Sequence, residues 1–262
     1  MSSLSSALID SLARRWWFFL VVVLLFFSPA YTTQPFNPAD TPQLVIEVLA
    51  HALAFSVPVL FPLFKLIPVI LVVGLVLLPA RTARLFYAWA GINLIVVAIF
   101  QDMAVTQTYG FAILVGNLIV YGLVGLLWIH AAFGPDAAKF KLSRTLPWWR
   151  YWVILPALLA FWYPVSVVGT VPAPSFAPVG LLANEAGLTF CMMLPVYLAL
   201  LTLGYPNVDR TVLRVSGFIG IITGLLNVFE FFLIPIYGPW MGTLHLPLLL
   251  ISVYAFGLSL RK

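Results

Sequence analysis

Cysteine is almost missing from this sequence: Cys191 is the single one among 262 residues. One cysteine excludes an internal disulfide framework and any zinc or iron–sulfur site that needs several thiolates. Common enzyme motifs are missing too, since the sequence has no glycine-rich phosphate-binding loop followed by Lys-Ser or Lys-Thr, no HExxH and no Gly-x-Ser-x-Gly. Any chemistry must therefore depend on oxygen and imidazole groups, and we predict no metal site.

Charge is equally scarce in the chain. Charged residues make up 8% and hydrophobic residues 63%, whereas charged residues make up about 25% of an average soluble protein. This composition predicts an all-α, polytopic transmembrane helical bundle that forms a single membrane domain over residues 1–262, in contact with membrane lipids. The formal charge of +5 is expected to set the orientation in the membrane rather than to bind nucleic acid. A homo-oligomer or a larger membrane complex is compatible with this composition.

Apolar runs give the number of membrane crossings. A crossing helix needs about 20 apolar residues. A further apolar piece, 66–79, has 14 residues and contains Pro68 and Gly74, which favours a re-entrant or interfacial segment. The eight predicted spans are 16–31, 44–64, 85–101, 109–133, 151–169, 184–203, 215–236 and 242–260.

The basic residues test this count. With eight spans and the N-terminus inside, all thirteen Lys and Arg residues fall in inner segments, Lys65 among them. A nine-span arrangement would put Arg14, Arg15 and Lys65 outside, against the positive-inside rule. We therefore predict a multi-pass protein of the cell membrane with both termini in the cytoplasm. The alternative for residues 1–30 is a cleaved signal peptide, because residues 28–30 have the small side chains of a cleavage site.

One spacing occurs twice: an acid is followed after six residues by Tyr-Gly and after six more by a hydrogen-bonding side chain. The two copies are Glu230, Tyr237-Gly238 and His245, and Asp102, Tyr109-Gly110 and Asn117. Their offset of 128 residues favours a duplication into two parallel four-helix repeats, 14–133 and 148–262. Chance is the alternative, because Tyr121-Gly122 shows that the dipeptide also occurs elsewhere.

Ionisable residues gather in the outer half of the membrane in this topology. Such a group is costly at membrane depth and marks a functional site by default. Glu47 and His51 are four residues apart and share a helix face, and we expect them to converge with Glu185, Glu230 and His245. The alternative is local hydrogen bonding that shields each side chain. The candidate substrate- or proton-binding residues are Glu47, His51, Asp102, Asn117, Glu185, Glu230, Tyr237 and His245.

Amides and glycines inside the spans have structural interpretations. Asn93 and Asn227 are expected to form hydrogen bonds between helices rather than ligand contacts. Gly116, Gly122 and Gly125 predict a small-residue face for close helix packing.

Three classes of function fit these features. The first is a membrane protein with an outward-facing ionisable pocket that binds or carries a small solute coupled to a proton or cation. The second is a membrane-embedded enzyme that acts on a lipid or isoprenoid by Glu/Asp–His acid–base chemistry. The third is a non-catalytic subunit of a larger complex, with His51 and His245 as axial ligands of a haem; the sequence permits this cofactor and requires none. We favour the first class.

Overall fold

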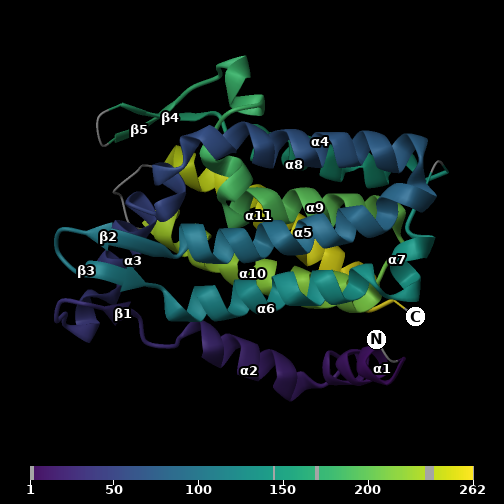
Figure 1. Ribbon diagram of the computed structural model, residues 1–262, viewed down its shortest axis with the longest axis horizontal. Coiled ribbons are helices and arrows are strands. Elements are labelled where there is room, and N and C mark those ends of the chain that lie inside the picture. Colours follow the sequence, from purple (N-terminus) through teal and green to yellow (C-terminus); the bar gives the residue numbers. More distant parts are fainter. Residues whose placement is uncertain (1–2, 144, 169–170, 234–238, 262) are drawn as a thin grey trace.

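Long helices run side by side through most of the molecule (Figure 1). The computed structural model describes residues 3–143, 145–168, 171–233 and 239–261. Within these ranges five helices are long and apolar enough to cross a membrane, and a bent pair, Pro178–Leu188 with Phe190–Gly204, makes a sixth if its two parts form one span. The five are α4 (Phe61–Leu77), α5 (Pro79–Gln101), α6 (Val115–Ala132), α10 (Arg210–Leu233) and α11 (Pro239–Ser259). The chain is therefore mostly helical and has the composition of a multi-pass membrane protein.

Two further apolar helices are shorter. α2 (Trp16–Phe26) has 11 residues and α8 (Ile154–Trp162) has 9, against about 20 for a full crossing. α8 ends where Tyr163 adopts a left-handed conformation with a φ of 47°, and Pro164 follows it. The described residues thus contain five or six candidate spans, fewer than the eight predicted.

The second predicted span and the predicted re-entrant segment are both wrong. Residues 44–64 do not form one helix: α3 (Thr41–Ala50) is followed by two 3-10 turns, and α4 then includes residues 66–77 of the piece 66–79. Pro62 lies in the first turn of α4, where proline has no amide hydrogen bond to lose, and Pro68 is accommodated inside the helix. The helix that could cross the membrane therefore begins near Phe61.

Short strands cover one end of the bundle, together with α3 (Figure 1). β1 (Tyr31–Thr32), β3 (Gly110–Ile113) and β2 (Met103–Thr106) form an antiparallel sheet in the order β1-β3-β2. β4 (Val165–Val168) and β5 (Val171–Pro174) form a separate antiparallel hairpin. We call this the strand-bearing end.

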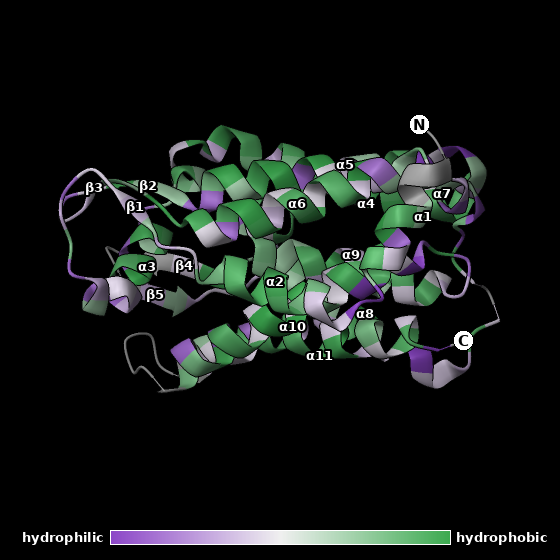
Figure 2. Ribbon diagram, turned by 90° about the horizontal axis from the view of Figure 1, so that it is seen from below, coloured by the Kyte–Doolittle hydropathy of each residue, from purple (hydrophilic) through white to green (hydrophobic). Residues whose placement is uncertain are grey.

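The opposite end carries α1 (Ser3–Leu12), α7 (Pro135–Lys139) and the C-terminal end of α11 (Figure 1). We call it the basic end, because arginines or lysines lie between α1 and α2, in α7, and where α5 and α10 begin. Figure 2 shows hydrophobic residues along the helices and the most hydrophilic segments mainly at the two ends. This division is typical of helices that lie in a membrane.

Aromatic side chains fill the middle of the bundle toward the basic end. Five aromatic rings have neighbouring centroids 5.3–6.0 Å apart. They belong to Phe86 and Tyr87 of α5, Trp128 of α6, Phe140 directly after α7, and Tyr197 of α9 (Phe190–Gly204). All five are buried, and Trp128 Nε1 donates a hydrogen bond to Ser216 Oγ over 2.9 Å. These rings join α5, α6 and α9, so the helices that carry polar residues at the strand-bearing end are held in fixed positions.

Candidate functional site

A cavity of about 440 Å³ lies at the strand-bearing end. Its walls come from α3, the β4–β5 hairpin, the C-terminal ends of α5 and α10, and the N-terminal turns of α9 and α11. Most of the lining side chains are apolar. The polar side chains that line it include His51, Gln101, Glu185, Asn227, Glu230 and His245. Four ionisable groups from different elements therefore share one largely apolar cavity.

The two histidines are oriented in the same way. His51 Nδ1 lies 3.0 Å from the backbone oxygen of Glu47, and His245 Nδ1 lies 2.9 Å from that of Met241. Because a carbonyl oxygen only accepts hydrogen bonds, Nδ1 carries the proton in both rings, and Nε2 holds the lone pair whenever a ring is neutral. His51 is exposed and His245 is 6% exposed, so the two rings differ in their access to water.

The two carboxylates reach the cavity from different helices. Glu185 begins the 3-10 helix Glu185–Leu188, directly after Asn184, whose side chain caps that turn. Glu230 lies in the last helical turns of α10, three residues after Asn227. Asn227 Nδ2 donates to Cys191 Sγ over 3.0 Å, which joins α10 to α9. Asn227 therefore forms the predicted hydrogen bond between helices and also lines the cavity.

Lys65 is a residue that the sequence interpretation misplaced. It was assigned to an inner segment, but it lies inside α4 and is 0% exposed. Its ammonium group donates to the backbone oxygen of Phe161, lies 4.4 Å from the centroid of that ring, and attracts the carboxylate of Glu185. The sequence signal for its burial was a lysine with apolar residues on both sides. Lys65 thus places a buried amine close enough to the cavity residue Glu185 for the two groups to attract each other when both are charged.

Three of the predicted site residues, Glu47, Asp102 and Asn117, are described but do not line the cavity. Glu47 does not line the cavity; its Oε1 accepts a hydrogen bond from the backbone amide of Thr108 over 3.3 Å. Asp102 is 0% exposed, and its Oδ1 accepts from Asn117 Nδ2 over 3.1 Å. Tyr237 falls outside the described residues. The structure therefore brings together four of the five residues that we expected to converge.

Asp102 lies behind the cavity wall. The residue before it, Gln101, lines the cavity and accepts a hydrogen bond from the backbone amide of Phe190 over 2.6 Å. Asp102 Oδ2 is buried and has no hydrogen-bond partner among the described residues. Burial raises the pKa of the Asp102 carboxyl well above its usual range, and the hydrogen bond from Asn117 opposes that shift only in part.

Comparisons with known proteins do not identify the chain. No family model matches it, and comparison with curated proteins and with solved structures gives no match. The functional argument therefore depends on the geometry of the cavity.

The chemistry available in the cavity is proton exchange and hydrogen bonding. Among the described residues, no group of three or more His, Cys, Asp and Glu side chains could hold a metal ion. Imidazole Nε2 atoms and carboxylates can accept protons or hydrogen bonds from a solute. Haem ligation by His51 and His245 stays a prediction. The apolar lining suits a ligand that is itself largely apolar, with a polar group directed at the acids and histidines.

Proposed function

We propose that this protein is a multi-pass membrane protein that binds a small solute in the cavity at the strand-bearing end, coupled to a proton or a cation. The observation that carries the proposal is the convergence of His51, Glu185, Glu230 and His245 on one cavity, although they come from four separate segments. His245 is buried, Glu185 and Glu230 are half-buried, and His51 is exposed. Holding ionisable groups together in a largely apolar cavity of a membrane protein is costly, and the cost is offset where they bind a ligand or a proton.

The charges favour a solute with a positive charge or hydrogen-bond donors. Lys65 attracts Glu185, although the two side chains make no ion pair within 4.0 Å. Among the described residues Glu230 makes no ion pair within 4.0 Å, so a cation or a proton is its natural partner in the cavity. A histidine of the cavity that is in the neutral form adds a hydrogen-bond acceptor through Nε2.

The proposed orientation places the basic end in the cytoplasm and the cavity at the outer face of the cell membrane. The positive-inside rule supports it, because the described arginines and lysines lie toward the basic end, with the exception of Lys65 near the N-terminal end of α4. An outward-facing cavity suits the uptake or sensing of a solute from outside.

A membrane-embedded enzyme that acts on a lipid or isoprenoid is the second candidate. The mainly apolar lining favours it, since an acyl or isoprenoid chain could lie beside Glu230 and His245, which would act as general acid and base. Turnover of such a substrate, lost in both Glu230→Gln and His245→Gln, would favour this candidate over binding or transport.

The test is a ligand screen on the purified full chain. Thermal unfolding in detergent is followed with a panel of small organic cations, with their neutral isosteres and with isoprenoid alcohols. We expect at least one compound to raise the melting temperature of the wild-type protein and to lose this effect in Glu230→Gln. Asp40→Asn, an exposed acid of the strand-bearing end that does not line the cavity, is the matched control. Equal stabilisation of wild-type and Glu230→Gln by every compound that binds would refute the proposal, as would an absence of binding across the panel.

A further inference from the structure

A second cavity, of about 450 Å³, lies between α2, α6 and α10 and shares no lining residue with the first. Its lining side chains are apolar except for His130, near the end of α6. We call it the α2–α6 groove. In a bundle that lies in a membrane, such a groove faces acyl chains rather than water.

The α2–α6 groove is closed at one end and extends toward the basic end. A Cβ on Gly116 would collide with the backbone oxygens of Leu25 and Phe26, so α2 touches the first turn of α6 directly. The groove begins beside this contact, and Figure 1 shows α2 farther from α6 toward α1. Close packing at one end and separation at the other leave room for a chain-like ligand.

The length of the α2–α6 groove matches one leaflet. It runs along α6 from Val120 to His130, which is about 15 Å of helix at the usual rise per residue. The hydrocarbon core of a bilayer is about 30 Å thick, so this length is about half of it. One acyl chain of a lipid in the leaflet at the basic end therefore fits.

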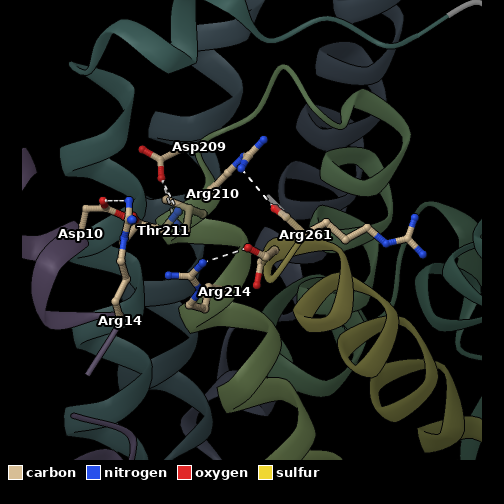
Figure 3. A network of polar contacts seen from close by, with 9 residues as sticks. Asp10, Arg14, Asp209, Arg210, Thr211, Arg214 and Arg261 are labelled. Atoms are coloured by element: carbon tan, nitrogen blue, oxygen red, sulfur yellow. Dashed lines mark hydrogen bonds and ion pairs between the residues drawn. The ribbon is translucent and has the colours of Figure 1, made fainter. Parts of the chain in front are cut away.

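The side chains at the open end are basic. Ile9 and Val215 line the groove, and their neighbours Asp10 and Arg214 belong to the polar network in Figure 3. Asp10 pairs with Arg14 and accepts from Thr211 Oγ1 over 2.9 Å. Arg14, Arg210 and Arg214 belong to this network with the two acids Asp10 and Asp209, and Arg15 is an exposed residue next to Arg14 in the chain, which leaves positive charge in excess.

Several guanidinium donors in this network lack an anionic partner. Arg210 Nη1 and Arg214 Nη2 donate to the backbone oxygens of Arg261 and Ser259, over 3.2 and 2.9 Å. Arg214 Nε is buried and has no hydrogen-bond partner among the described residues. Each guanidinium carries five N–H groups, so the network can still bind the oxygens of a phosphate.

We propose that the α2–α6 groove binds an anionic phospholipid, with one acyl chain between α2 and α6 and the phosphate at Arg14, Arg15 and Arg214. The apolar lining of the groove binds the acyl chain, and the basic cluster at the open end of the groove selects an anionic headgroup over a zwitterionic one. The lipid fills the space that α2 leaves beside α6. The site therefore attaches α1 and α2 to the rest of the bundle.

The test measures lipid binding to the full chain by native mass spectrometry and by thermal unfolding in detergent. We expect phosphatidylglycerol to bind at least tenfold more tightly than phosphatidylcholine and to raise the melting temperature. Arg15→Gln is expected to weaken phosphatidylglycerol binding about fivefold, as for the loss of one basic residue near an anionic lipid surface. Leu123→Trp, which fills the groove from α6, is expected to abolish binding of both lipids at this site.

Two matched variants serve as controls. Lys141→Gln removes a positive charge outside the network, and Leu155→Trp enlarges an exposed side chain of α8 that does not line the groove. Both should bind phosphatidylglycerol like the wild type. Equal affinity for the two lipids would overturn the anionic site, and wild-type binding by Leu123→Trp would overturn its location in the groove. Should Leu123→Trp fail to fold, Arg15→Gln measured against Lys141→Gln decides the matter: equal losses in the two variants reject the proposal.

Discussion

Asn117 donates a hydrogen bond to Asp102 over 3.1 Å, although 15 residues separate them. Asp102 follows the last turn of α5, Asn117 lies in the first turn of α6, and the β2–β3 hairpin brings the two helix ends together. Glu230 and His245 have the same separation in the sequence and line one cavity. The repeated spacing thus produces a hydrogen-bonded polar pair in one place and two cavity residues in the other. The duplication of halves 14–133 and 148–262 stays a prediction.

The Asp102 carboxyl should make stability depend on pH. Because its pKa is raised above the ordinary value of 3.8, the folded protein favours the neutral acid more than the unfolded chain does. That contribution to stability is fully present below the unfolded-state pKa and is lost as the pH rises through the folded-state pKa. Asp102→Asn keeps this position neutral at every pH. The melting temperature of the variant minus that of the wild type should therefore increase as the pH is raised from about 4 to about 8.

Thermal unfolding of both proteins across this range in one detergent measures the effect. Asp40→Asn, at an exposed position, is the control and should follow the wild type. A melting-temperature difference between Asp102→Asn and the wild type that stays constant with pH would contradict the prediction.

Lys65 and Glu185 should be energetically coupled. Lys65→Met removes a buried lysine whose positive charge attracts the half-buried Glu185 carboxylate, although the two side chains make no ion pair within 4.0 Å. Their coupling should therefore be smaller than the roughly 3 kcal/mol lost when a buried contact pair is broken. In Lys65→Met/Glu185→Gln both charges are absent, so we expect the double variant to be more stable than the sum of the two single effects predicts. Unfolding titrations of the four proteins give the coupling free energy. Simple additivity would mean that the two groups do not interact.

The class of the protein and much of the candidate site could be predicted from composition and from costly side chains. His51, Glu185, Glu230 and His245 are conspicuous because ionisable residues are rare in apolar runs, and the structure places all four at one cavity. Glu47 has the same signal, but it turns to the β2–β3 hairpin instead. Polarity shows that a side chain needs a partner, and only the fold decides which partner it finds.

The start of α4 could not be predicted from hydropathy. Residues 52–79 are apolar apart from Ser56 and Lys65, so nothing polar marks where a helix should begin. The prolines decide it, because Pro58 and Pro62 occupy first-turn positions and leave the preceding residues in tight turns. The strands were missed for a different reason. They have two to four residues each, and β3 and β4 lie at the ends of the apolar runs 109–133 and 151–169, which were predicted to be helical spans.

The proposed orientation can be tested by cysteine labelling, because Cys191 is buried and gives little background. Gln107→Cys places a thiol at the tip of the β2–β3 hairpin, and Ala138→Cys places one on α7 at the basic end; both positions are exposed. In intact cells a membrane-impermeant maleimide should label Gln107→Cys, and Ala138→Cys only after lysis. The unmodified protein is the control. Labelling of Ala138→Cys alone in intact cells would reverse the orientation and place the cavity on the cytoplasmic side.

Two glycines of α6 should respond oppositely to alanine. A Cβ on Gly125 would lie 2.6 Å from Ile95 Cγ1 and 2.7 Å from the backbone oxygen of Gly91, whereas a Cβ on Gly122 would have no neighbour within 4 Å. The predicted face of three packing glycines is therefore wrong at Gly122. Gly125→Ala must push α5 and α6 apart, which costs about 1–3 kcal/mol. Gly122→Ala should be neutral or stabilise the helix by up to about 1 kcal/mol.

Thermal unfolding of the two variants under one condition checks this pair. The substitutions add the same methyl group to the same helix, three residues apart, so they share any change in helix propensity. A difference in melting temperature therefore reports contact with α5. Equal melting temperatures would mean that α5 and α6 are not as close at Gly91 and Gly125 as the structure has them. Because α5 ends at the cavity residue Gln101, separating the two helices should also lower the affinity of any ligand that binds in the cavity.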